Sequence, residues 1–343
     1  MSDHSPRKDT GSDIGTPIPS YSPPTTGVLS YLPRSLVSYG ELARIHRPNG
    51  FFLVYFPHLF GTLYATATSK QPSPASMVLR LNAVLFIGSL FSRSAICAWN
   101  DVLDREYDRQ VLRCRLRPIA RRAISPMQGL LFTGLLTAIA LVCLGWLPKL
   151  CWAIAVPDVF LMALYPFTKR FMDFPQLVLG VQFAMGVLIG AGSIDGTAIE
   201  KMSNAMRGID THCDGWALLA FYCATACWTI VYDTIYAQLD VEDDIRAGVR
   251  SMAVYFRGHT KTLLWGVSIS MVTLLFLSGY LQGFGPGYFT VTCGGTMCSL
   301  VYMLSTVDLA DPSDCQWWFQ NGHWFIGSAI SIGLWLQSQL IIV

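Results

Sequence analysis

The chain has 343 residues, of which 52% are hydrophobic and only 13% are charged, and its mean hydropathy is +0.42. A soluble globular domain usually carries about 25% charged residues. Several apolar stretches here reach about 20 residues, the length that spans a bilayer, so a soluble helical protein with a large core is excluded. The net charge of +2 gives no indication of nucleic-acid binding, and the ten scattered Cys residues form no CxxC pair. We expect these cysteines to be small packing residues rather than disulfides or zinc ligands.

The first 40 residues are rich in Ser, Pro, Thr and Gly, which predicts a disordered N-terminal segment. This segment lacks the apolar core of a signal peptide, and its acidic residues are atypical of a mitochondrial transit sequence. We expect residues 41–343 to form one transmembrane domain.

Nine apolar windows follow, so the predicted fold class is an all-α polytopic membrane protein with about nine transmembrane helices. Most of the 24 Lys and Arg residues lie in the N-terminal segment and in the loops after the second, fourth and sixth windows. The positive-inside rule places these regions on the cytoplasmic side. The windows are residues 50–69, 80–100, 127–147, 150–168, 174–193, 214–236, 262–282, 286–306 and 323–343.

Two acidic clusters follow the second and sixth windows, both on the predicted cytoplasmic side. The first contains Asn100, Asp104 and Asp108, and the second contains Asp240 and Asp244. On a helix, residues spaced by four turn by only about 40° per step, so each set shares one face. Carboxylates held this close repel one another unless cations neutralise them. Oxygen ligands of this kind suit Mg²⁺, and two facing clusters would bind a diphosphate through bridging magnesium. Ordinary solvated loop charge is the alternative, and the repeated spacing beside apolar spans disfavours it.

Basic residues accompany both clusters. The run from Arg105 to Arg122 serves either membrane topology alone or a cationic rim that attracts an anionic diphosphate. Tyr165 and Lys169 end the fourth window one helical turn apart. They would bind a phosphate oxygen, or Lys169 would bind the last carbonyls of its own helix.

These motifs, taken together, resemble those of the UbiA-type intramembrane aromatic prenyltransferases, from about residue 41 to the C-terminus. The matching segments are Asn100-Asp-x-x-Asp104-x-x-x-Asp108 with Arg117-Pro118, Asp233-Thr-Ile-Tyr236 through Asp240, Asp244 and Gly248, Tyr165-Pro-x-x-Lys169-Arg170, Pro175 to Gly180, and Arg44-x-x-Arg47-Pro-x-Gly50.

The resemblance implies helices arranged around a central cavity, with two Mg²⁺ ions between the acidic clusters. One ion would be held by Asn100, Asp104 and Asp108, and the other by Asp240 and Asp244. Asp101 and Asp243 would support these ligands from behind. The catalytic set would be Asp104, Asp108, Asp240, Asp244 and Lys169, and the prenyl diphosphate would contact Arg44, Arg117, Tyr165, Lys169, Arg170 and Tyr236.

The implied reaction is ionisation of a prenyl diphosphate and capture of the allylic cation by an aromatic carbon, in a cavity that excludes water. The aromatic side chains Phe51, Phe52, Tyr55 and Phe183 would either line this cavity or pack between helices.

The chain departs from the hydroxybenzoate polyprenyltransferases at residues 181–186 and 248–252. We expect residues 181–186 to face the acceptor, Ala184 and Met185 to make 4-hydroxybenzoate a poor one, and the aromatic acceptor to be different or larger. The likeness favours fungal secondary-metabolite enzymes that attach a farnesyl chain, from farnesyl diphosphate, to a phenolic polyketide in meroterpenoid biosynthesis. The expected location is the endoplasmic reticulum or Golgi membrane, with the mouth of the site facing the cytoplasm and no obligate protein partner.

Three alternatives remain open. The first is the 4-hydroxybenzoate polyprenyltransferase of ubiquinone biosynthesis, and the second is a membrane terpene cyclase of the same fold. The third is a cation transporter with acidic gates. The basic loops and the set Tyr165, Lys169 and Arg170 would serve no purpose in a cation path, so the transporter is disfavoured.

Overall fold

The computed structural model describes residues 21–69, 73–111, 113–209 and 213–340, and within these ranges the chain forms helices and turns without strands. In chain order the elements are η1 (Val28–Tyr31), α1 (Arg34–Leu42), α2 (Asn49–Thr68), α3 (Ala75–Leu103), α4 (Arg105–Asp108), α5 (Pro126–Gly145), α6 (Lys149–Thr168), α7 (Pro175–Ile194), α8 (Thr197–Met206), α9 (Asp214–Ala237), η2 (Gln238–Asp240), α10 (Val241–Ala247), α11 (Met252–Tyr255), α12 (Thr260–Gln282), α13 (Pro286–Tyr288), the π-helical segment η3 (Phe289–Gly294), α14 (Gly295–Thr306) and α15 (Pro312–Gln339).

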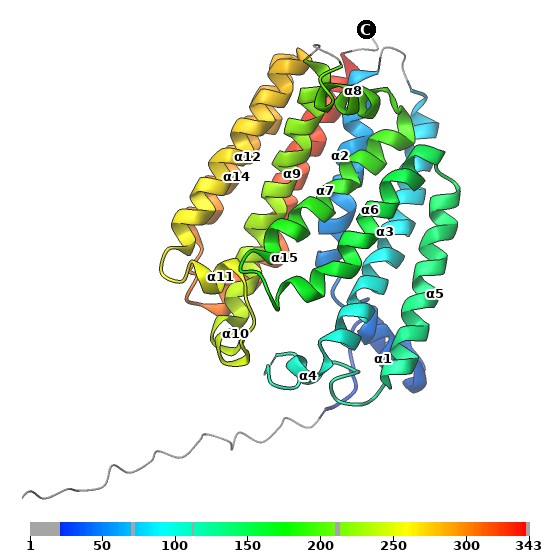
Figure 1. The fold of residues 1–343 in the computed structure, drawn as a ribbon, viewed down its shortest axis with the longest axis vertical. Helices are drawn as coiled ribbons and strands as arrows, with labels where there is room; N and C mark the ends of the chain where they lie inside the picture. Colours follow the sequence, from blue (N-terminus) through cyan, green and yellow to red (C-terminus); the bar gives the residue numbers. More distant parts are fainter. Residues whose placement is uncertain (1–20, 70–72, 112, 210–212, 341–343) are drawn as a thin grey trace, which may run out of the picture.

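The long helices run side by side in one bundle, and the short helices gather at its two ends (Figure 1). Helices α1, α4, α10 and α11 lie at one end, and α8 lies at the other. The all-α membrane fold is confirmed. Six described helices, α3, α5, α6, α7, α9 and α12, are long and apolar enough to cross a bilayer. A helix lies at each of the nine windows, but a total of nine spans stays a prediction.

The centre of the bundle is held by close approach of α2, α7 and α9. Glycines permit this contact, because a side chain would strike the backbone of the facing helix. A Cβ at Gly190 of α7 would lie 2.1 Å from the His58 carbonyl oxygen of α2, and one at Gly61 of α2 would lie 2.1 Å from the Val187 carbonyl oxygen. Small residues are the usual means of packing membrane helices this tightly. The result is a rigid core from which the polar helix ends project.

Part of the stretch expected to be disordered is helical. Disorder is expected through residue 40, and residues 1–20 lie outside the described part of the chain. Beyond them, Val28–Tyr31 and Arg34–Leu42 are helical, which corrects the expectation for this stretch. The cause is apolar burial, since Leu29 and Leu42 are 2% and 0% exposed. The average composition of the first 40 residues does not reveal single buried apolar residues such as Leu29.

Candidate active site

A cavity of about 480 Å³ lies at the end of the bundle that carries α4 and α10. Every site residue expected from the sequence lines it, and their roles stay predictions until tested. They are Arg44, Asn100, Asp104, Asp108, Arg117, Tyr165, Lys169, Arg170, Tyr236, Asp240 and Asp244.

The two acidic clusters are built at breaks between helices, not on continuous helices as the spacing suggests. Asp104 ends α3 with φ −92° and ψ 6° and begins α4, and Asp240 has φ −122° and ψ 5° where α10 begins. Each aspartate is therefore the N-cap of a short helix, a position that aspartate favours. Neither side chain makes a capping hydrogen bond. Both carboxylates are left to interact across the cavity.

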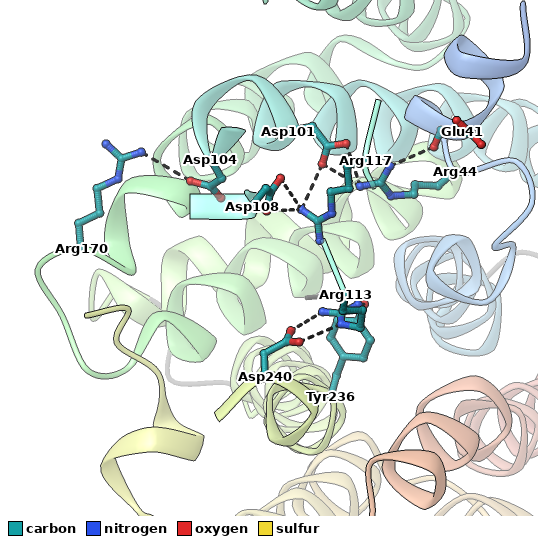
Figure 2. Close-up of polar contacts among 10 residues, drawn as sticks. All are labelled: Glu41, Arg44, Asp101, Asp104, Asp108, Arg113, Arg117, Arg170, Tyr236 and Asp240. Carbon is teal, nitrogen blue, oxygen red and sulfur yellow. Dashed lines mark hydrogen bonds and ion pairs between the residues drawn. The ribbon is translucent and has the colours of Figure 1, made fainter. Parts of the chain in front are cut away.

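Arginines pair with these carboxylates (Figure 2). Arg113 binds Asp240 through two nitrogens, with Nε 2.9 Å from Oδ1, and its Nη1 donates to the Tyr236 hydroxyl at 2.5 Å. Arg170 lies 3.5 Å from Asp104. The charge repulsion expected of the clusters is thus relieved by guanidinium groups, which any incoming metal ion has to replace or share.

Arg117 joins two carboxylates of the first cluster. Its Nη1 lies 3.0 Å from both oxygens of Asp108 and 3.3 Å from Asp101. Asp101 is 1% exposed and also accepts two hydrogen bonds from Arg44 Nη2, at 2.7 and 2.9 Å. Arg44 has a φ of 58°, a rare conformation for a residue with a side chain. Asp101 thereby ties α3 to the turn after α1, consistent with a supporting position behind the cluster.

We expect Asp101→Ala to destabilise the protein. Removing one partner of a buried ion pair leaves the opposite charge buried and unpaired, which lowers the free energy of unfolding by about 3–5 kcal/mol. Because Arg44 and Arg117 keep some exposure, we expect the lower end of that range. Thermal unfolding in detergent measures the effect. The control is Glu106→Ala, a carboxylate that is 62% exposed and should matter little. Equal melting temperatures for the two variants would contradict the role of Asp101.

Burial alters the ionisation of the first cluster. It raises the pKa of Asp108 to about 6, with Arg117 opposing the shift. At the end of α6, Tyr165 raises the pKa of Lys169, and Asp104, Asp233 and Asp244 raise it further, so the ammonium stays charged. The cavity therefore holds a fixed cation among carboxylates that benefit from an added positive charge.

The donor set fits Mg²⁺. Carboxylates from two directions and one amide are the hard oxygen ligands this ion prefers. Asn100 Oδ1 is buried and has no hydrogen-bond partner among the described residues, as expected of an oxygen atom that binds a metal ion. No three His, Cys, Asp or Glu side chains of the described ranges converge on one point as they stand.

The lining of the apolar part of the cavity decides between the two roles that the sequence left open for the aromatic candidates. Among the four aromatic candidates only Phe183 lines it, whereas Phe51 and Tyr55 pack on Phe86, and Phe52 on Trp324.

Within residues 181–186, likewise, only Phe183 faces the cavity. Ala184 is fully buried, and Met185 packs against the hydrophobic core. Helix α7 turns these two side chains away, because one residue advances the helix by about 100°. They give no basis for excluding 4-hydroxybenzoate.

Several charged residues of the cavity were given no role by the sequence analysis. Arg113 could not be told apart from its neighbours in the basic loop. Arg93 could have been found, since an arginine inside an apolar span is costly and usually functional. Arg47 and Asp233 lie inside matched motifs and also line the cavity.

Comparison with known proteins agrees with this geometry. The UbiA prenyltransferase family matches residues 54–328. The prenyltransferase ascA of Acremonium egyptiacum is 37% identical over 285 residues, which is 83% of this chain and 81% of that protein. The DMOA farnesyltransferase nvfB of Aspergillus novofumigatus is 35% identical over 280 residues, 81% of this chain and 84% of its own.

Among solved structures, a UbiA homologue from Archaeoglobus fulgidus bound to DMAPP and Mg²⁺ has the same fold. Its TM-score is 0.62 at 14% identity, with 89% of this chain and 99% of that chain covered. Fold, motifs and relatives agree, and the resemblance seen in the sequence is confirmed. This chain belongs to the UbiA prenyltransferase family and is an integral membrane prenyltransferase.

Proposed function

We propose that the protein transfers a farnesyl group from farnesyl diphosphate to an aromatic carbon of a phenolic polyketide, in a Mg²⁺-dependent reaction of meroterpenoid biosynthesis. The observation that carries this proposal is one cavity lined by both acidic clusters, by Lys169 and by several arginines. The farnesyl donor is supported by the relative named DMOA farnesyltransferase.

The polar end of the cavity would bind the diphosphate. Asn100, Asp104 and Asp108 would hold one Mg²⁺, and Asp240 and Asp244 a second. A solved homologue of the same fold is bound to Mg²⁺ and DMAPP, which supports magnesium as the ion. Magnesium at this position would neutralise the charge of the departing diphosphate.

The side chains of the chain itself contribute to the same step. Lys169 is half-buried at the end of α6 with its ammonium 5.2 Å from the Tyr165 ring centre, so its position is set before substrate arrives. A preorganised cation stabilises the developing charge of the leaving group without reorganisation. Arg170 is close enough to Asp104 to bind either that carboxylate or the diphosphate.

The deeper wall of the cavity is apolar and is provided by α2 and α7, with Leu53, Val54, Leu179 and Phe183. It would hold the prenyl chain and exclude water, which would otherwise capture the allylic cation. Capture by the aromatic ring forms the carbon–carbon bond, and loss of the ring proton restores aromaticity.

The acceptor would bind near Arg93, with its acidic group facing the guanidinium. Arg93 has no carboxylate partner among the described residues, and its Nη2 donates a hydrogen bond to the Arg47 carbonyl oxygen at 3.4 Å. Gly50 makes room for it, because a Cβ there would lie 2.6 Å from Arg93 Nη2. An unpaired charge in a membrane-spanning helix normally serves a ligand. An acidic phenol is the acceptor that suits it.

The mouth of the cavity would face the cytoplasm in the endoplasmic reticulum or Golgi membrane. The basic loop and α10 lie at the same end of the bundle as α1 (Figure 1). The positive-inside rule assigns that end to the cytoplasm.

Product analysis tests the proposal. Purified protein is incubated with Mg²⁺, diphosphates of different chain length, and a panel of phenolic acids that includes 4-hydroxybenzoate. We expect a C-farnesylated polyketide acid to form fastest. A cyclic hydrocarbon or alcohol from farnesyl diphosphate without acceptor would instead identify a terpene cyclase. Efficient transfer of long chains to 4-hydroxybenzoate would identify the ubiquinone enzyme.

A further inference from the structure

A second, smaller pocket of about 270 Å³ lies outside the cavity and shares four arginines with it. The shared residues are Arg44, Arg47, Arg113 and Arg117. The outer side of this pocket is formed by the N-terminal segment, including Ser22. The same guanidinium groups therefore line both the catalytic cavity and a space at the protein surface.

The outer pocket has an excess of positive charge. Arg44, Arg113 and Arg117 are paired with carboxylates that belong to the cavity. Arg47 is exposed and forms no ion pair in the described ranges. Clustered arginines of this kind recognise phosphate-type anions.

The wall formed by the N-terminal segment is held in place by specific contacts. The Tyr21 hydroxyl donates to Glu41 at 2.8 Å, and the Tyr21 ring lies 3.7 Å from the Arg121 guanidinium. Arg121 in turn lies 2.5 Å from Glu41 and 3.1 Å from the Ser38 hydroxyl. The residues before α1 are thereby braced against the basic loop, with Ser22 beside the pocket.

We propose that this outer pocket is an exit site for inorganic pyrophosphate, which passes from the catalytic cavity along the shared arginines. The inference rests on the proposed function, because prenyl transfer is what releases pyrophosphate. A multiply charged anion crosses a low-dielectric region at great cost unless cations accompany it. Because the same guanidinium groups line both spaces, the pyrophosphate stays in contact with positive charge as it moves from the cavity to the outer pocket.

The test measures binding of radiolabelled inorganic pyrophosphate to the full-length protein in detergent with EDTA, and excess unlabelled pyrophosphate defines the non-specific binding. We expect one saturable, metal-independent site. Ser22→Asp places a negative charge beside the pocket and should weaken this binding about 10-fold, since like charges at close range repel. Lys169→Ala should leave the site intact, because Lys169 lines the cavity and not the outer pocket.

The matched control is Ser35→Asp, the same substitution on α1 at an exposed residue that lines neither pocket, and it should bind like the wild type. The inference is overturned if no saturable site exists in EDTA. It is equally overturned if Lys169→Ala removes the site while Ser22→Asp binds like Ser35→Asp. Since the assay uses neither prenyl donor nor acceptor, its result is separable from the failure or success of the proposed prenyl transfer.

Discussion

Asp104→Ala and Asp240→Ala should each reduce turnover by about 1,000-fold or more while the protein remains folded. Loss of a metal ligand removes charge stabilisation of the leaving group, and one such interaction is worth about 100- to 1,000-fold in rate. The loss should be larger here because the freed arginines rearrange around the remaining carboxylates. Initial rates of prenyl product formation measure the effect, and thermal unfolding in detergent confirms folding.

Each of these variants has a matched control one turn or less away. Glu106 and Glu242 are 62% and 64% exposed, and each pairs with an arginine at the surface. Glu106→Ala and Glu242→Ala should keep nearly full activity. EDTA should abolish wild-type activity, and added Mg²⁺ should restore it. If Asp240→Ala turned over at the rate of Glu242→Ala, the assignment of two metal ions would be wrong.

Lys169→Ala should lower kcat by about 100-fold, the usual effect of removing one preorganised donor to a developing charge. Lys169→Arg should recover part of the rate, since it restores the charge but not the geometry of an ammonium group. The comparison is made by steady-state kinetics with varied prenyl diphosphate. A role in ground-state binding alone would raise KM and leave kcat unchanged, which separates the two possibilities.

Lys201 provides the control for this experiment. It lies on α8, at the other end of the bundle, and pairs with Asp214 at 2.6 Å. Lys201→Ala removes an equivalent charge far from the cavity and should leave kcat within about twofold, because partly exposed ion pairs contribute little. An equal loss in both variants would mean that kcat reports general destabilisation instead of leaving-group chemistry.

The positions of the helices and the residues that line the site were predictable, because both depend on patterns within short stretches of the sequence. Apolar runs of about 20 residues predict helices, and spacing by four residues predicts shared faces. The breaks at Asp104 and Asp240 were not predictable, because a continuous helix satisfies the same spacing. The partner of Asp240 could not be identified for another reason. Six arginines follow the first cluster, and only the folded loop shows that Arg113 is the one that pairs with Asp240.

Pocket specificity was the least predictable property. Adjacent positions such as Phe183 and Ala184 differ completely in what they face, so a helix boundary wrong by one residue reverses the conclusion. The intramembrane Arg93 was the stronger signal. Placing a charged side chain inside a membrane span costs free energy whichever face of the helix it lies on.

The cavity draws its charged groups from helix ends and loops and its apolar wall from helix interiors. This division makes the enzyme modular. Substitutions at Leu179 or Phe183 can reshape the space for donor or acceptor without moving a carboxylate, while the glycine contacts between α2 and α7 keep the scaffold unchanged. Diversification of product range, in nature or by engineering, can therefore proceed at the apolar wall of the cavity while the ionising chemistry at its polar end is inherited intact.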